Sequence, residues 1–206
     1  MVTRLFLNNK KSMKKILLII VTIITSATLN AQDKDVTKFL GIPVDGTKAA
    51  MIQKLKAKGF TSNPYDKDVL EGEFNGKDVH IYVATNNNKV YRIALVDKNP
   101  SDETGIRIRF NNLCAQFENN KKYMSPKDQR LPNNTDISYG IRLENKQYEA
   151  SFYQLPTIIS DKNENELFNE TLNRHVWFTI QEEKYGKYCI YMFYDNDNNC
   201  ANGEDL

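Results

Sequence analysis

Residues 78–96 read DVHIYVATNNNKVYRIALV. In their first part Val79, Ile81 and Val83 occupy alternate positions, as expected of a strand that buries one face. The asparagines at 86–88 favour a tight turn, because asparagine tolerates positive φ. A second apolar run follows at 90–96. The stretch therefore predicts an antiparallel β-hairpin, and hairpins joined by short polar turns leave no room for the crossover helices of a parallel sheet.

Similar patterns predict the remaining strands. Further strands are expected at 71–76, 147–155, 176–180 and 188–194. Residues 137–143 should pair with 147–155, because the polar residues 144–146 between them suit a turn. The sequence thus predicts a second hairpin in this region. Residues 160–166 are polar, and we expect a connection there.

Two helices are predicted from caps and apolar spacing. The first covers 47–58, where Asp45 and Thr47 are candidate N-caps and Gly59 accepts the positive φ of a helix stop. The second begins near Ser101 and places a stripe of apolar side chains on one face: Ile106, Phe110, Leu113 and Phe117. A stripe of this kind should pack against the sheet.

The order of these elements predicts the fold class. A helix followed by strands occurs twice, which suggests a structural duplication within residues 32–206. We therefore expect a single α+β domain, with helices packed on one face of an antiparallel sheet and the other face partly open. A short polar tail should end the chain.

The beginning of the chain resembles a secretory leader. In residues 13–31, Lys14 and Lys15 precede an apolar run at 16–24, and small residues such as Ala31 follow. This pattern predicts a cleavable signal peptide after an N-terminal extension, with translation starting at Met1 or Met13. The run is shorter than the ~20 residues of a membrane span. We expect export to the periplasm or cell exterior, with no membrane anchor after cleavage.

The charge balance argues against a nucleic-acid partner. Residues 1–31 contain five of the 28 Lys and Arg residues and none of the 26 Asp and Glu residues. Residues 32–206 therefore carry 23 basic and 26 acidic side chains, a formal charge of −3. A basic stripe, which nucleic-acid binding requires, is not apparent in this part of the sequence.

The three cysteines lie in residues 32–206, where an oxidising compartment would allow pairing. Cys189 and Cys200 could close a short disulfide loop, whereas Cys114 fits a buried thiol on the second helix. Three unpaired cysteines are an equally good interpretation. The two histidines, His80 and His175, fall opposite the apolar faces of their strands, so a Cys–His couple would need tertiary proximity.

No motif predicts catalytic residues, a cofactor or a metal. Asp195, Asp197 and Asn199 alternate as in the first half of a calcium loop. Cys200 and Leu206 stand where such a loop requires glycine and glutamate, so a solvated tail is the favoured interpretation.

Aromatic side chains are the strongest candidates for binding. They lie in predicted strands whose second face could remain open, and the candidate binding residues are Tyr82, Tyr91, Tyr139, Tyr153, Trp177 and Tyr191. Rings of this kind bury large areas at low entropy cost. The alternative is that these rings fill a thick core or lie singly on the surface. We expect a non-catalytic module that contacts a protein partner, with a small-molecule or glycan binder and a two-carboxylate enzyme as alternatives.

Three segments carry a resemblance: FLGIPVDGT at 39–47, MIQKLKAKGF at 51–60 and ANGEDL at 201–206. With these segments the chain resembles secreted proteins of unknown function from Bacteroides-like bacteria. The resemblance implies a fold similar to that of β-lactamase-inhibitor protein and small outer-membrane assembly factors, and it implies no catalytic residues. The chain departs from the assembly factors because it lacks a lipid-anchor cysteine near the predicted cleavage point.

Overall fold

The computed structural model describes residues 35–157, 163–184 and 186–200. These belong to one compact unit, residues 35–206. The predicted leader at 13–31 and the ANGEDL segment lie outside the described residues. The elements, in chain order, are β1 Lys38–Phe39, β2 Ile42–Pro43, α2 Lys48–Ala57, β3 Thr61–Ser62, β4 Val69–Phe74, β5 Lys77–Asn86, β6 Lys89–Asp97, α3 Glu103–Glu118, β7 Tyr123–Met124, α4 Ile137–Glu144, β8 Glu149–Gln154, α5 Glu164–Leu172, β9 His175–Lys184, β10 Lys187–Asp195 and the 3₁₀ turn η1 Asp197–Asn199.

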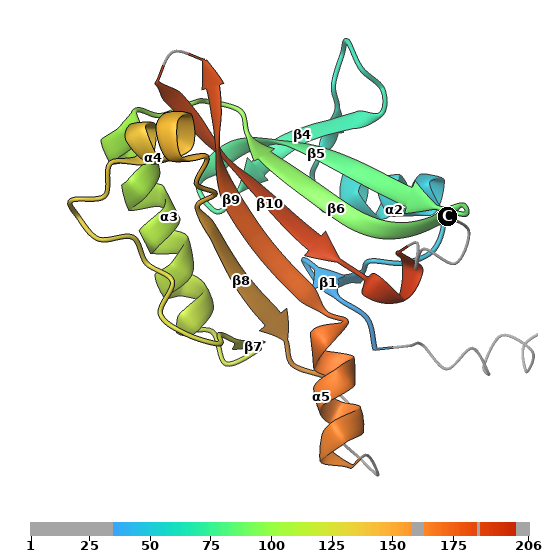
Figure 1. Cartoon of the computed structure of the whole chain (residues 1–206). Helices are drawn as coiled ribbons and strands as arrows, with labels where there is room; N and C mark the ends of the chain where they lie inside the picture. Colours follow the sequence, from blue (N-terminus) through green and yellow to red (C-terminus); the bar gives the residue numbers. More distant parts are fainter. Residues whose placement is uncertain (1–34, 158–162, 185, 201–206) are drawn as a thin grey trace, which may run out of the picture. The chain divides into compact units, whose positions relative to one another are not determined.

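The main sheet has eight strands in the order β3-β4-β5-β6-β10-β9-β8-β7, and neighbouring strands run antiparallel (Figure 1). The predicted hairpin of residues 78–96 is β5 and β6, with Asn87 and Asn88 at positive φ in the turn. The α+β class and the antiparallel sheet are therefore confirmed. Among the described residues, no helix has the length and hydrophobicity needed to cross a membrane.

The element order repeats within this sheet. Residues 48–97, the first repeat, contain α2 followed by β3 to β6. Residues 103–195, the second repeat, contain α3 followed by β7 to β10, with α4 and α5 inserted between strands. The two repeats meet where their last strands, β6 and β10, pair. The predicted succession of helix and strands is thus present twice.

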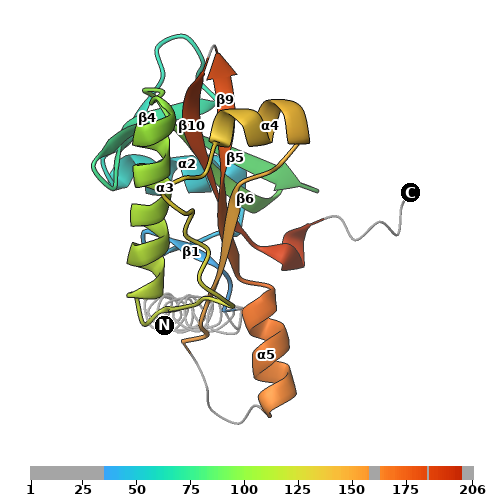
Figure 2. The same ribbon diagram turned by 60° about the vertical axis from the view of Figure 1, so that its left-hand side comes forward.

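The core lies between the sheet and helices α2 and α3, which lie on the same side of the sheet in Figure 2. Met51 and Leu55 of α2 are buried, and α2 contacts β5 and β6. On α3, Phe110 makes an edge contact with Phe178 of β9 at 5.0 Å between ring centroids. Phe117 of α3 stacks on Phe152 of β8 at 4.6 Å. Burying such rings is the dominant stabilising term of a domain this size.

Both predicted helices are confirmed, the first with its predicted cap Thr47 and stop Gly59. The Thr47 hydroxyl accepts a hydrogen bond from the Ala50 backbone N–H at 3.3 Å, and Gly59 follows α2 with φ at +101°. The Asp102 carboxylate accepts from the Gly105 N–H at 2.7 Å and so begins α3.

Residues 137–143 form helix α4, so the predicted hairpin with 147–155 is wrong. The Asp136 carboxylate accepts from the Tyr139 N–H at 2.8 Å, and Asn145 ends the helix in the left-handed region with φ at +51°. Ile137 is buried and Ile141 partly buried, a spacing of four. A short apolar run fits both periods, and here the cap decides between them.

Helix α5 forms where the sequence indicated a polar connection. Asn163 and Glu166 build a capping box, with the Asn163 side chain accepting from the Glu166 N–H at 2.9 Å. Directly after α5, Arg174 is 2 % exposed and donates to Asp35 at 2.7 Å. Burial works against the Asp35 charge, but the Thr157 N–H, Arg174 and Lys38 outweigh it and lower the pKa of Asp35 to about 2. This ion pair fixes the chain where the described residues begin.

Candidate functional site

The face of the sheet opposite α2 and α3, called the open face here, carries the candidate site. Strand pairing puts five residues in one row across it: Tyr82, Ala94, Phe193, Trp177 and Ser151. The adjacent row contains His80, Val96, Tyr191, Thr179 and Glu149. Tyr82 is 42 % exposed, and the rings of Phe193, Trp177 and Tyr191 are half-buried.

Four rings on this face stack one after another, and this series is called the aromatic row. Tyr153 of β8 stacks on His175 of β9, with ring centroids 5.1 Å apart. His175 stacks on Trp177 at 6.1 Å, and Trp177 stacks on Phe193 of β10 at 4.2 Å. Each pair has its planes within 27° of parallel. Strand alternation and register therefore join residues from three strands into one ordered surface.

An ion pair anchors the end of the aromatic row. Arg92 of β6 donates to Asp195 through Nε at 2.6 Å and Nη2 at 2.8 Å, and the Trp177 indole Nε1 donates to the same carboxylate at 2.9 Å. The Asp195 side chain is only 4 % exposed. Its hydrogen bonds to Arg92 raise the guanidinium pKa above the usual value. The carboxylate thus couples the two repeats and orients the indole.

Phe193 contacts two groups from neighbouring strands. The Arg92 guanidinium lies 4.8 Å from its centroid, and the Trp177 indole stacks on it at 4.2 Å. The guanidinium also lies 5.6 Å from the Trp177 ring, so the three groups form one mutual cluster. Cation–π contact and stacking hold the rings of this cluster in place.

The structure brings four of the six predicted binding residues to the open face: Tyr82, Tyr153, Trp177 and Tyr191. Tyr91 lies at the irregular point of the β5–β6 pairing, and its ring centroid is 5.7 Å from the Arg92 guanidinium. Tyr139 is on helix α4 and 51 % exposed, so its assignment to a sheet face is wrong. The misassigned secondary structure of 137–143 caused that error.

Four residues of the aromatic row and its ion pair were absent from the predicted binding residues: Arg92, His175, Phe193 and Asp195. Strand alternation could have put Arg92 on the same face as Ala94, since both positions flank buried Ile93. Phe193 belongs to an apolar strand without a visible period. Asp195 was assigned to the polar tail, but it ends β10 and is buried.

The end of the chain is docked up to Cys200, which corrects the expectation of a solvated tail there. The backbone N–H of Asn196 donates to the Tyr91 carbonyl at 2.7 Å, and the Asn199 amide donates to Asp45 at 2.9 Å. Asp195 and Asn199 are therefore already engaged in other contacts, and the second half of the calcium-loop pattern lies outside the described residues. Leu206 lies outside the described residues.

Cys189 and Cys200 are free thiols, so the structure agrees with unpaired cysteines, the second of the two interpretations. Cys189 lies near the start of β10, about 20 Å of extended strand before Asp195. Cys200 lies past the other end, where its Sγ is 3.8 Å from the Asn196 carbonyl. A disulfide needs Cα atoms within roughly 7 Å.

Cys114 is fully buried in α3, and burial raises its pKa to about 12. Both histidines lie on the opposite face of the sheet, so neither forms a Cys–His couple with Cys114. Burial also lowers the pKa of His175. Its Nε2 is buried without a hydrogen-bond partner among the described residues.

A shallow depression of about 390 Å³ lies beside the aromatic row. Its lining includes Trp177, Phe193 and Tyr191, and acidic or amide side chains surround them: Gln147, Glu149, Gln181, Glu182 and Glu183. The Tyr191 hydroxyl donates to Glu183 at 2.6 Å. Burial and this carboxylate raise the Tyr191 pKa above the usual range. The hydroxyl thus stays protonated and holds Glu183 at the rim.

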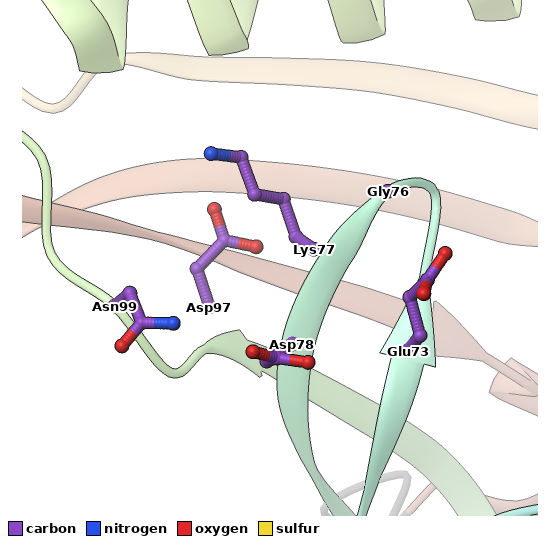
Figure 3. A pocket seen from close by; sticks show the side chains of 6 residues that line it. All are labelled: Glu73, Gly76, Lys77, Asp78, Asp97 and Asn99. Carbon is purple, nitrogen blue, oxygen red and sulfur yellow. The ribbon is translucent and has the colours of Figure 1, made fainter.

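A second hollow, of about 400 Å³, lies at the ends of β4, β5 and β6 (Figure 3). In Figure 3, Lys77 and Asp97 extend toward α3, and Glu73 and Asp78 lie apart from them. Asp97 is 8 % exposed and paired with Arg109 at 3.2 Å. A pair of carboxylates that acts as acid and base must face one substrate. Asp97 is engaged by Arg109, while Glu73 and Asp78 are cross-strand partners at the edge of the hollow.

No protein-family model, curated protein or solved structure matches the chain. The resemblance to secreted Bacteroides-like proteins and to the β-lactamase-inhibitor fold therefore stays a prediction.

Proposed function

We propose that the protein is an exported, non-catalytic binding module that contacts a protein partner through the open face of its sheet. The observation that carries this proposal is the aromatic row on that face, Tyr153, His175, Trp177 and Phe193, held by the ion pair between Arg92 and the buried Asp195. A preorganised surface of rings loses little entropy on binding, and interfaces are enriched in Trp, Tyr and Arg.

Further support comes from the shape of this surface. The depression beside the row is shallow and open, which suits a side chain of a partner better than an enclosed small molecule. A glycan that stacks on an aromatic platform needs free ring faces, and Phe193 and Trp177 already contact each other and Arg92. The signal-like segment at 13–31 supports export to the periplasm or cell exterior.

Affinity capture from a native envelope extract tests the proposal. The full chain, tagged at its C-terminus and purified as the cell processes it, serves as the bait. The Trp177→Ala/Tyr191→Ala variant removes two rings of the depression. We expect mass spectrometry to identify a protein that is retained by the unaltered chain and lost with this variant.

The matched control is Tyr65→Ala/Tyr139→Ala, which removes two exposed rings outside the open face; Tyr65 is 96 % and Tyr139 51 % exposed. This control should retain the partner. Circular dichroism and a melting curve establish that each variant is folded at the capture temperature. If a captured protein binds all three chains equally, the open face is not the interface.

A further inference from the structure

We infer that the depression on the open face binds a basic side chain, an arginine by preference, presented by the protein partner. This inference rests on the proposed function and names the chemistry of its partner. Three observations on the depression carry it: its charge, its aromatic wall and a buried hydroxyl in its lining.

The lining of the depression is acidic. Its ionisable groups apart from Tyr191 are carboxylates, and no lysine or arginine lines it. The carboxylate of Glu182 is matched by the guanidinium of Arg142. Glu149 and Glu183 are exposed, and neither forms an ion pair with a basic side chain in the described part of the chain. The rim therefore presents two carboxylates that a cationic ligand can pair with, and the charge of −3 on residues 32–206 acts in the same direction.

Two aromatic rings that line the depression already contact one guanidinium, that of Arg92. Arg92 lies 4.8 Å from the Phe193 centroid and 5.6 Å from the Trp177 centroid. Trp177, Phe193 and Tyr191 also line the depression. A planar guanidinium stacks on aromatic rings and pairs with carboxylates at the same time, which an ammonium does less well. The internal contact of Arg92 is thus a model for the contact that a partner would make.

The lining also contains a hydroxyl with spare hydrogen-bonding capacity. Thr179 is 3 % exposed and lines the depression. Its Oγ1 contacts the Ile180 carbonyl at 3.5 Å, the outer limit of a hydrogen bond. The hydroxyl oxygen can therefore accept an N–H from a bound side chain. A ligand that brings donors and positive charge satisfies the rim carboxylates and this hydroxyl together.

The probe is the peptide acetyl-Gly-Arg-Gly-amide, titrated into the ¹⁵N-labelled full chain and followed by NMR. Trp177 is the only tryptophan of the sequence, so one indole N–H signal reports directly on the wall. The control peptide contains citrulline, which has the shape of arginine without its charge. We expect saturable shifts of the indole signal and of the Thr179 amide with the arginine peptide, and none with citrulline.

The variant Glu149→Gln/Glu183→Gln removes the two rim charges and keeps hydrogen-bond acceptors in place. We expect it to weaken the arginine peptide roughly fivefold, the size of an exposed ion-pair contribution, and the wild-type affinity to fall with added salt. A matched variant, Glu73→Gln/Asp78→Asn, removes the same charge from the far end of the open face and should leave the affinity unchanged. Equal shifts by both peptides, or absence of shifts at Trp177 and Thr179, would overturn the inference.

Capture separates this inference from the proposed function. If the partner retained by the unaltered chain is also retained by Glu149→Gln/Glu183→Gln, the basic-side-chain inference fails and the binding module stands. The arginine peptide could also bind as expected while no captured protein depends on Trp177 and Tyr191. In that case the inference of a basic ligand stands, and the proposed function as a protein-binding module fails.

Discussion

The two repeats follow the same element order and carry different surfaces. On the first repeat the open face is mainly polar, with Glu71 hydrogen-bonded to His80 at 3.1 Å and to Lys98 at 3.1 Å. On the second repeat it carries the aromatic row, and two helices are inserted between its strands. The repeats share a core and a sheet. The difference indicates that the shared fold provides the sheet face, and that the proposed binding surface depends mainly on side chains of the second repeat.

We expect the largest effect from a substitution of Arg92. This residue belongs to the first repeat and forms an ion pair with Asp195 of the second repeat. Arg92→Met leaves the Asp195 carboxylate, 4 % exposed, without its cation. We expect the free energy of unfolding to fall by about 3 kcal/mol, as when one partner of a buried ion pair is removed. Urea denaturation measures this change.

The control for this prediction is Arg130→Met, because Arg130 pairs with Asp128 at 3.0 Å on the surface. Its loss should stay below about 1 kcal/mol. Equal losses for the two variants would mean that Arg92 does not join the repeats.

The substitution Gly72→Ala tests how tightly side chains pack within the first repeat. A Cβ at this position would lie 2.5 Å from the ring of Phe60, which is buried beside it. Gly72→Ala should therefore lower the free energy of unfolding by about 2 kcal/mol, the cost of overpacking. In the Phe60→Leu background the same substitution should cost clearly less. An unchanged cost in that background would contradict the clash.

The next prediction concerns how the free energy of unfolding depends on pH through His175 of the second repeat. Burial lowers its pKa in the folded protein, while Asp195, Asp197 and Glu149 favour protonation and Arg92 opposes it. The unfolded chain takes up a proton near pH 6.5, its ordinary value, and the folded chain does so only at lower pH. The free energy of unfolding should therefore fall as the pH drops below about 6.5, and level off below the folded pKa.

Thermal melts of the wild type and of His175→Gln between pH 7.5 and 4.5 measure this dependence. The difference between the two curves isolates the histidine from the carboxylates. If both chains lose stability along the same slope, His175 does not titrate as its burial indicates.

The smallest expected effect concerns the cysteines at the end of the second repeat. Because Cys189 and Cys200 are free thiols, dithiothreitol should leave the melting temperature unchanged. Alkylation of the unfolded protein without reductant should modify Cys114, Cys189 and Cys200 alike. A lower melting temperature in reductant, together with protection of two thiols, would restore the disulfide.

Local signals predicted the parts of the fold whose neighbours in sequence are also neighbours in space. Thr47 and Gly59 bound helix α2, and the asparagines at 87 and 88 turn the β5–β6 hairpin. The strand prediction for residues 137–143 was wrong because their apolar spacing fits both a strand and a helix. The Asp136 cap, Asn145 and packing of Ile137 select the helix there.

The candidate site was predicted only in part, for a physical reason. Tyr82, Tyr153, Trp177 and Tyr191 carry a composition signal that is visible along the chain. Arg92 and Asp195 are separated by 103 residues, and no local pattern links them. Their pairing depends on the β6–β10 register. The ion pair that organises the rings was therefore invisible in the sequence.

The sequence by itself determined the α+β class, the two helices with their caps and the repetition of helix and strands, because these depend on residues within one turn or one hairpin of each other. The tertiary structure alone decided which rings stack, that Asp195 is buried under Arg92 and Trp177, and that Cys189 and Cys200 lie apart. Those features depend on the register of strands distant in sequence, and register is set by the burial of a whole face rather than by any single residue.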